Sequence, residues 1–410
     1  MKYLKSICLG FALLNLIGCS KDSGVIKTSS NPIDCQVNEN LNPALKSLVD
    51  TFFTTNHAPG VAVLISSPTL GRNAYFKGYA VKEDLVPVSS NTLWHTMSVG
   101  KSFTAAAILA LVEQGTISLD QSLASWGVAI PNHASGPVTF RMALNHTSLL
   151  ERPFNTKLSD PNFRITTDPT NTKEKHLLDA LDLGWLSGTN CCTDPDYDET
   201  QVPGGFQLGS TPYYSDANST ALAIALEKIT GKTWNQAIRD LVMKPWNLSE
   251  SFFLSIDVPE NPASYISPYL RAKKYESFTE DPAMPPRPLS DQFLQYASGA
   301  GTVISSVCDL ERFSTAFYKG SQLSSTIRTQ QLNYVIDYDN GRLGLGVQGD
   351  TNLHPKLEYI GHFGGGPGGG GVAAYNPKNE VVIVIVTNFS DPIYPVGGLM
   401  FNLLSQIENL

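Results

Sequence analysis

Apolar residues recur with a regular period near both ends of the chain. Over residues 44–53 they fall three or four positions apart, which predicts a helix, and residues 60–66 form a compact run rich in Val and Ile, which predicts a strand. The elements expected in the N-terminal part are therefore a helix over 44–53, strands over 60–66 and 73–78, and a long helix over 98–115.

The C-terminal part predicts a β-hairpin and a last helix. Strands over 372–375 and 381–387 flank the turn sequence Asn-Pro-Lys-Asn, and residues 397–407 follow with helical spacing. Between about 117 and 290 the pattern indicates helices and loops only. Strands from both ends can pair in one sheet when the middle forms an inserted lobe. We expect an α+β fold, with an antiparallel sheet flanked by helices and an inserted all-helical lobe over about 117–290.

The first 41 residues are expected to precede this domain. A short basic segment leads into an apolar run over 7–18, which is shorter than the roughly 20 residues of a spanning helix and typical of a secretory signal. Leu-Ile-Gly-Cys at 16–19 is similar to a bacterial lipobox, whose Cys is acylated after cleavage. We expect a signal peptide over 1–18, lipidation of Cys19, a polar tether over 19–41 and the domain over 42–410.

The expected location follows from the same segment. Ser20 follows Cys19, which for a Gram-negative lipoprotein indicates the outer membrane, on the side facing the periplasm. The only membrane contact expected is then the lipid anchor. An ordinary signal peptide cleaved nearby, with Cys19 unmodified, is the alternative interpretation.

Composition narrows the class of partner. The chain has 410 residues, of which 42% are hydrophobic and 16% charged, so it can bury a large core and is not disordered as a whole. Its 29 Lys and Arg against 37 Asp and Glu give a net charge of −8. Such a chain has no overall positive field to attract a polyanion, and nucleic acid is not an expected partner.

Four cysteines remain once Cys8 leaves with the signal and Cys19 is acylated. In an oxidising compartment they allow one or two disulfides, whose pairing the sequence leaves open. The adjacent pair at 191–192 lacks the ligand spacing of a zinc site, so no metal or organic cofactor is expected. The four candidates are Cys35, Cys191, Cys192 and Cys308.

The first candidate for chemistry is the sequence Ser-Val-Gly-Lys at the start of the helix expected over 98–115. Positions three apart lie on one face of a helix, so the Lys101 amine can reach the Ser98 hydroxyl. A partly buried amine can accept the serine proton, and the helix N-terminus favours a developing oxyanion. By itself, the pair is equally compatible with helix capping or surface chemistry.

A second candidate is Tyr-Tyr-Ser-Asp at 213–216, just before an amphipathic helix over 220–229. A phenol beside a cation can carry a proton between a nucleophile and a leaving group, which suits Tyr214. Without further context, the simpler interpretation is that Tyr213 and Tyr214 pack in the core and Asp216 caps the helix.

The third candidate is the segment that begins Gly361-His362-Phe363 and continues through glycines to Gly371. Glycines let a substrate approach a strand backbone closely, and His362 offers a donor or a switchable charge. The segment lacks the pattern of a phosphate-binding loop.

Three motifs follow one another along the chain: Ser-x-x-Lys, Tyr-Ser-x and His-x-Gly. Their order, together with strands at both ends of the domain, resembles that of the penicillin-recognising serine hydrolases. That family includes class C β-lactamases, D-Ala-D-Ala carboxypeptidases and their esterase relatives of family VIII. The resemblance covers about 42–410 and is weak only in the loop stretches 151–212 and 256–292. Further blocks that carry it lie at 59–63, 92–105, 144–148 and 298–301.

The resemblance implies a role for each matched residue. Ser98 would be acylated, Lys101 would help to deprotonate it, and Tyr214 would pass protons to and from the leaving group. The oxyanion would be held by the backbone N–H groups of Ser98 and Gly365. Gly365 would lie on the glycine-rich strand that also carries Gly364. His-Thr-Ser at 146–148 would support the pocket rather than take part in the reaction.

Three positions depart from the family pattern. Asp216 stands where the family usually has Asn and sometimes Asp, and an ionised carboxylate paired with Lys101 would hold that amine charged, shifting the base role towards Tyr214. His362 stands where most β-lactamases have Lys and several peptidases and esterases have His, and a mostly neutral imidazole anchors a substrate carboxylate less firmly. Phe363 replaces a small residue, which leaves the width of the pocket open.

We therefore predict a lipid-anchored cell-envelope serine hydrolase that works through an acyl-enzyme on amide or ester bonds. Its substrate would be a small molecule or a peptide, with a peptidoglycan stem as one candidate. A D-Ala-D-Ala carboxypeptidase-like or esterase-like activity comes first and a β-lactamase second. An alternative of another class is a catalytically silent envelope module that binds peptidoglycan or a partner through the same cleft, for which Asp216 and Phe363 leave room.

Overall fold

The computed structural model describes most of the predicted domain. The expected signal peptide, Cys19, and residues 20–34 and 36 of the expected tether lie outside the described residues, as do Cys191 and Cys192. Within the described part, no helix has both the length and the hydropathy needed to cross a membrane. The described residues are 35, 37–81, 85–130, 132–152, 205–253, 298–336, 341–349, 358–366, 369–389 and 393–410.

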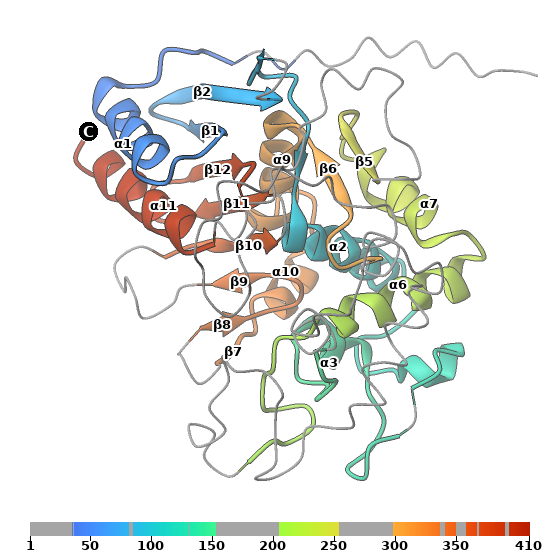
Figure 1. Ribbon diagram of the computed structural model, residues 1–410. Helices are drawn as coiled ribbons and strands as arrows, with labels where there is room; N and C mark the ends of the chain where they lie inside the picture. The colour runs from blue at the N-terminus through green and yellow to red at the C-terminus, as the bar shows by residue number, and fades with distance from the viewer. Residues whose placement is uncertain are drawn as a thin grey trace, which may run out of the picture. The chain divides into compact units, whose positions relative to one another are not determined.

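The main sheet joins strands from both ends of the chain, as the hydrophobic pattern predicts (Figure 1). β1 and β12 are antiparallel neighbours in register, with Val63 opposite Ile385. The strand order is β3-β2-β1-β12-β11-β10-β9-β8-β7. The bounds are β1 (Gly60–Ser67), β2 (Gly71–Val81), β3 (Val86–Pro87), β7 (Val335–Ile336), β8 (Arg342–Leu343), β9 (Gln348–Gly349), β10 (Ile360–Gly366), β11 (Gly369–Asn376) and β12 (Val381–Thr387).

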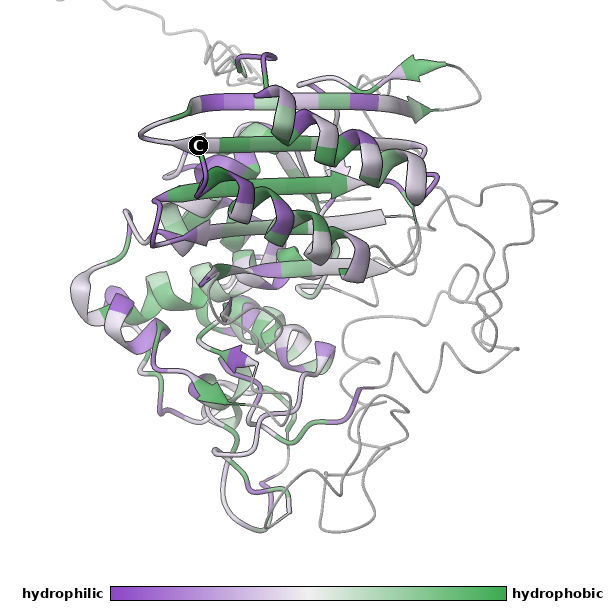
Figure 2. Cartoon of the chain, turned by 90° about the vertical axis from the view of Figure 1, so that its left-hand side faces the viewer, coloured by the Kyte–Doolittle hydropathy of each residue, from purple (hydrophilic) through white to green (hydrophobic). Residues whose placement is uncertain are grey.

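The central strands are apolar without interruption because both of their faces are buried. In β1, Val61 and Val63 contact the core on one face, while Ala62 and Leu64 belong to the core on the other. The first face is covered by α1 (Pro43–Thr55) and α11 (Ile393–Ile407), which lie side by side. Figure 2 shows these two helices in front of the sheet, whose inner strands include long green, hydrophobic stretches, while the uppermost strand also carries purple residues.

The opposite face carries the helices that build the site. α2 (Gly100–Glu113) is buried on nearly every side, as expected for a helix whose apolar residues surround it. It contacts α6 and the π-helical turn η4. The other elements are η2 (Leu123–Trp126), α3 (Phe140–Leu144), α6 (Asp216–Thr230), α7 (Trp234–Ile238), η4 (Arg239–Met243), α9 (Val307–Phe313), the π-helical turn η6 (Ser314–Tyr318) and α10 (Ser325–Gln331).

A small second sheet supports the turn that precedes α2. Its order is β4 (Trp94–His95), β6 (Val303–Ser305) and β5 (Ser251–Phe253). β5 falls within 117–290, where the sequence predicts helices and loops only. Three residues are too few to show the alternation of a strand, and β5 is formed by its pairing with β6, some 50 residues away.

One disulfide fixes the start of the described domain. Cys35 is bonded to Cys308 in α9, with their Cα atoms 5.7 Å apart and both residues buried. Of the four cysteines left open by the sequence, these two are therefore partners. The bond attaches the segment before α1 to the layer of helices on the other face of the sheet.

Candidate active site

Ser98 lies in a tight turn that runs directly into α2. The turn, η1 (Met97–Val99), is anchored by Thr96, whose backbone N–H and side-chain hydroxyl both donate to the Val303 carbonyl of β6 at 3.1 and 2.8 Å. Met97 has a φ of 46°, a left-handed conformation that is unfavourable for a residue with a side chain. The local strain and the double anchor together present the half-buried Ser98 at the tip of α2.

Lys101 is one helical turn further on, and its amine is surrounded by acceptors. Its Nζ lies 2.7 Å from the Ser98 Oγ, 3.0 Å from the Ala300 carbonyl oxygen and 2.5 Å from Oδ1 of Asp216. Only 3% of the Lys101 side chain is exposed. The amine is thus held against the nucleophile by groups from three separate parts of the chain.

These contacts determine how the amine can take up a proton. A carbonyl and a carboxylate only accept, so two of the amine hydrogens are committed to Ala300 and Asp216, and the third is left for the hydroxyls of Ser98 and Tyr214. Burial by itself lowers the pKa of Lys101, but the charges of Asp216 and then Tyr214 outweigh it and raise the pKa above its usual value. The resting amine is charged, and it can accept the Ser98 proton only after it passes one to a neighbour.

Tyr214 lies beside Lys101, with its ring close to two cations. The Lys101 amine is 5.1 Å from the ring centroid and the Arg152 guanidinium carbon is 5.2 Å from it. The imidazole of His146 stacks on the ring at 4.5 Å with an angle of 23° between the planes. This stacking fixes the plane in which the Tyr214 hydroxyl can move.

The start of α6 explains how Tyr214 and Asp216 reach the site. Ser215, and not Asp216, caps the helix: its hydroxyl oxygen accepts from the Ala217 N–H at 3.2 Å. The simpler interpretation from sequence, in which Asp216 is the cap, is therefore wrong, and the Asp216 carboxylate faces Lys101 instead. Tyr213 is the packing residue of the pair, because it is buried and its hydroxyl donates to the Glu151 carboxylate at 3.2 Å.

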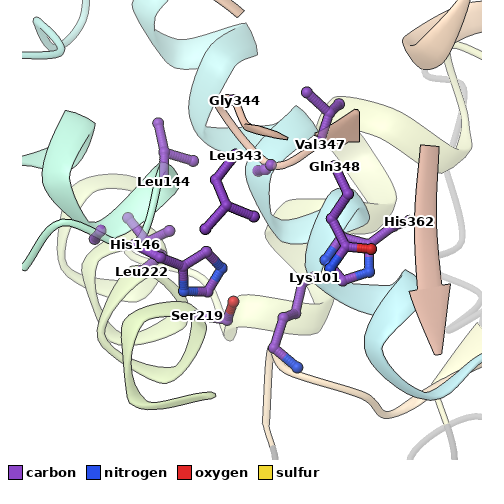
Figure 3. Close-up of a pocket in the computed structure, with 13 residues that line it drawn as sticks. Lys101, Leu144, His146, Ser219, Leu222, Leu343, Gly344, Val347, Gln348 and His362 are labelled. Carbon is purple, nitrogen blue, oxygen red and sulfur yellow. The ribbon is translucent and has the colours of Figure 1, made fainter. Parts of the chain in front are cut away.

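Two buried histidines border the Lys101 side chain (Figure 3). Burial, assisted by the charge of Lys101, lowers the pKa of His146 and that of His362 to about 3, so both rings are neutral. The Nδ1 atom of His146 accepts from the Ser215 N–H at 3.1 Å, which places its hydrogen on Nε2. The Nδ1 atom of His362 lies 2.6 Å from the Phe363 carbonyl oxygen, which can only accept, so His362 carries its hydrogen on Nδ1.

The space between these histidines is narrow. Figure 3 shows Lys101, His146, Ser219 and His362 around a cavity with about 10 Å³ of free space, which suffices for one water molecule. A substrate cannot occupy it.

β10 faces the nucleophile turn with its glycines. A side-chain carbon on Gly364 would lie 2.2 Å from the Thr96 carbonyl oxygen and 3.0 Å from the Ser98 nitrogen, so only glycine allows this approach. The Phe363 N–H donates to Gln348 at 3.0 Å, on the side away from β11. Because N–H directions alternate along a strand, the Gly365 N–H also points away from β11, to the edge where Ser98 lies.

Phe363 lies on the other face of the sheet. Its ring belongs to the core beneath α11 and lies edge-on to Tyr359, with centroids 5.7 Å apart. A side-chain carbon on Gly397 of α11 would lie 3.7 Å from it. The large side chain therefore does not narrow the site, which answers the question that the sequence left open.

The structure brings together Ser98, Lys101, Tyr214 and Asp216, with His362, Gly364 and Gly365 on the facing strand. Sequence reasoning did not single out Arg152 or the Ala300 carbonyl. Ala300 lies in one of the family blocks, but nothing local marks its carbonyl as an acceptor for Lys101. Among the described residues, no group of three or more His, Cys, Asp or Glu side chains could hold a metal.

This combination of fold and site has known counterparts. Residues 45–397 match the family model named Beta-lactamase, and the chain belongs to that family. The match confirms the predicted class, a penicillin-recognising serine hydrolase with a mixed helix and antiparallel-sheet fold.

Individual relatives are more distant. Penicillin-binding protein 4* of Bacillus subtilis is 25% identical over 302 residues, which make up 71% of this chain and 59% of that protein. The chain thus spans less than two thirds of this relative's length. D-amino acid amidase from Ochrobactrum anthropi SV3, solved with D-phenylalanine, is 19% identical with a TM-score of 0.73, covering 89% of this chain and 98% of the amidase. The octameric penicillin-binding protein homologue from Pyrococcus abyssi has a TM-score of 0.71 at 21% identity, covering 88% of this chain and 77% of that one.

Proposed function

We propose that the protein hydrolyses amide bonds through an acyl-enzyme formed on Ser98. The observation that carries the proposal is the contact of 2.7 Å between the Ser98 hydroxyl and the Lys101 amine, in a site that also holds Tyr214. A serine hydroxyl becomes a useful nucleophile only when a neighbouring group can take its proton, and this site supplies two candidates.

The reaction follows from the positions of these groups. The Ser98 oxygen bonds to the carbonyl carbon while its proton passes to the Lys101 and Tyr214 pair. The N–H groups of Ser98 and Gly365 hold the oxyanion. The C–N bond then breaks as the leaving nitrogen receives the proton from Tyr214. Water attacks the resulting ester, the carboxylic acid leaves, and Ser98 regains its hydrogen.

The charges around Ser98 favour small amides and peptides as substrates. His362 is neutral and turns its N–H to the chain's own Phe363 carbonyl, so it offers a substrate carboxylate little attraction. This supports an amidase, whose small amide substrates need no carboxylate, ahead of a β-lactamase. The names of the relatives, a D-amino acid amidase and penicillin-binding proteins, are consistent with the proposal. Esters remain the second substrate class, since the same acyl-enzyme forms from them.

The test is covalent labelling of the nucleophile. The folded protein is incubated with a fluorophosphonate and, separately, with a fluorescent penicillin, and then digested for mass spectrometry. We expect the adduct on the peptide that contains Ser98, and its loss in Ser98→Ala. The matched control is Ser125→Ala, because Ser125 is an exposed serine on η2 and its removal leaves the site intact. A folded protein that takes up no label would favour the silent binding module instead.

A substrate panel then ranks the activities. Wild-type protein is assayed with D-amino acid amides, D-Ala-D-Ala peptides, p-nitrophenyl esters and nitrocefin. We expect the highest kcat/KM with an amide or peptide. Turnover of nitrocefin far above that of the other substrates would contradict the order proposed here and identify a β-lactamase.

We further propose that the protein is a lipoprotein of the cell envelope, anchored through Cys19 after removal of residues 1–18. The proposal rests on the basic, apolar and Gly-Cys elements in this order. Metabolic labelling with a palmitate analogue should mark the wild-type protein and not Cys19→Ala. A secreted, unlabelled wild-type protein would indicate an ordinary signal peptide.

A further inference from the structure

Arg152 lies at the site although none of the family blocks predicts it. It follows the buried Glu151, and its side chain is 24% exposed. Its Nε is 3.6 Å from Oδ2 of Asp216, and its guanidinium carbon is 5.2 Å from the centroid of the Tyr214 ring. A second cation thus contacts the carboxylate and the phenol that serve Lys101.

The two oxygens of Asp216 are divided between two cations. Oδ1 is 2.5 Å from the Lys101 amine, and Oδ2 is 3.6 Å from Arg152. Both cations interact with the same negative charge. A carboxylate shared between two cations therefore holds each of them less strongly than a carboxylate that pairs with one cation alone. An amide at this position could not pair with two cations in this way, so the arrangement depends on the Asp216 carboxylate.

We propose that Arg152 is a positioning residue of this active site, whose guanidinium shares the Asp216 carboxylate with Lys101 and so sets how readily the amine gives up a proton. The inference rests on the proposed role of Ser98 and Lys101. It goes beyond that role because it assigns Arg152, through Asp216, a function in the timing of proton transfer.

The other titratable groups around Lys101 do not supply this control. Tyr214 and Asp216 reach it from the start of α6, His146 from the segment after α3, and His362 from β10. Both imidazoles stay neutral above about pH 5, because burial lowers the pKa of each to about 3. Among these described groups, the Asp216 carboxylate is the charge that raises the pKa of the amine most, and Arg152 contacts that same carboxylate.

The direction of each effect follows from charge. Removing Arg152 leaves the whole Asp216 carboxylate to Lys101, so the amine keeps its proton to higher pH. Removing the carboxylate in Asp216→Asn has the opposite effect. The same signs hold if Tyr214 takes the proton, because its ring contacts the same two cations and lies beside the same carboxylate. The two substitutions must therefore move the acid limb of a pH–rate profile in opposite directions.

The experiment measures the rate at which a fluorophosphonate labels Ser98 between about pH 5 and about pH 10, which reports the proton acceptor without needing the natural substrate. We expect Arg152→Gln to raise the midpoint by about half a pH unit, which lowers the rate below the midpoint about threefold. Asp216→Asn should lower the midpoint, and Arg152→Lys, which keeps the charge, should restore it towards the wild-type value.

The double variant Arg152→Gln with Asp216→Asn decides whether Arg152 acts through the carboxylate. We expect the double variant to match Asp216→Asn alone. The matched control is Arg72→Gln. Arg72 has a similar exposure and pairs with Glu311, and it lies on β2, a strand remote from β10 in the sheet order. Its midpoint should stay at the wild-type value.

Two outcomes would overturn the inference: an unchanged midpoint in Arg152→Gln, or an equal shift with and without the Asp216 carboxylate. Either can occur while wild-type Ser98 is labelled normally, in which case the proposed hydrolase function stands. If wild-type Ser98 takes up no label, the proposed function itself fails. Thermal unfolding of each variant verifies that the rates compare folded proteins.

Discussion

Asp216 distinguishes the charge of this site from the usual family arrangement. The carboxylate holds Lys101 protonated, and His362 on the facing strand is neutral. Proton transfer from Ser98 therefore depends on redistributing protons among Lys101, Asp216 and Tyr214. At this scale, a single change from amide to carboxylate alters which group is ready to act as the base.

Gly364 provides a prediction about close approach. In Gly364→Ala, the new methyl group would lie 2.2 Å from the Thr96 carbonyl oxygen, so β10 must move away from the nucleophile turn. We expect the rate of Ser98 acylation to fall at least about 100-fold, because the Gly365 N–H leaves the position of the oxyanion. The measurement is the fluorophosphonate labelling rate of the folded variant.

The control for that substitution is Gly398→Ala in α11. A methyl group there meets no atom within 4 Å, and alanine is the better helix former. Labelling should proceed at the wild-type rate. If Gly364→Ala also kept the wild-type rate, the proposed placement of β10 against Ser98 would be incorrect.

At the scale of elements, each reacting group comes from a different unit that is fixed by burial. The η1 turn carries Ser98 and the first turn of α2 carries Lys101. Tyr214 and Asp216 lie on either side of Ser215, the N-cap of α6, and β10 supplies the facing edge. β4 and β6 hold the turn between them through Val303. Strain at Met97 persists because these elements are anchored independently of the turn.

The disulfide gives a prediction at this scale. It closes a loop of 273 residues between the segment before α1 and α9. Replacing both cysteines by serine should lower the free energy of unfolding by about 2–5 kcal/mol, because the cross-link restricts the unfolded chain. Urea denaturation measures the change, and the rate of Ser98 labelling at low temperature should stay the same.

Reduction supplies the matching control. A reductant should destabilise the wild-type protein and have a much smaller effect on the Cys35→Ser, Cys308→Ser variant. Equal urea midpoints for wild type and variant under oxidising conditions would show that this bond does not contribute to stability.

For the whole molecule, three buried histidines make stability depend on pH. Burial lowers the pKa of His95 to about 4 and that of His146 and His362 to about 3, from 6.5. Between these values and 6.5 the unfolded chain binds protons that the folded chain does not, so stability is complete above pH 6.5 and falls as pH decreases. The three together contribute up to about 4 kcal/mol per pH unit near pH 5.

The measurement is the free energy of unfolding in urea between about pH 4.5 and about pH 7. His95→Gln should reduce the slope by about one proton, since it removes one of the three groups. A free energy that does not change over this range would contradict the buried, neutral state of these imidazoles.

Periodic burial is a local property, and the sequence alone predicts what depends on it. The helices around 44–53 and 98–115 and the strands near both ends are found close to their expected bounds, because their apolar spacing directly records which faces are buried. The same reasoning fails at β5, which is too short to carry a period. The family blocks also pointed to Ser98, Lys101 and Tyr214 before any contact was known.

Contacts between distant segments could not be predicted in this way. They depend on how the packed elements meet, and the spacing of residues along the chain does not record them. Only the folded chain shows that Asp216 turns to Lys101 while Ser215 caps α6, that Phe363 faces α11, and that Arg152 joins the site. The pairing of Cys35 with Cys308 belongs to the same category. Each is set by packing across tens to hundreds of residues, and together these contacts control the charge and access of the nucleophile.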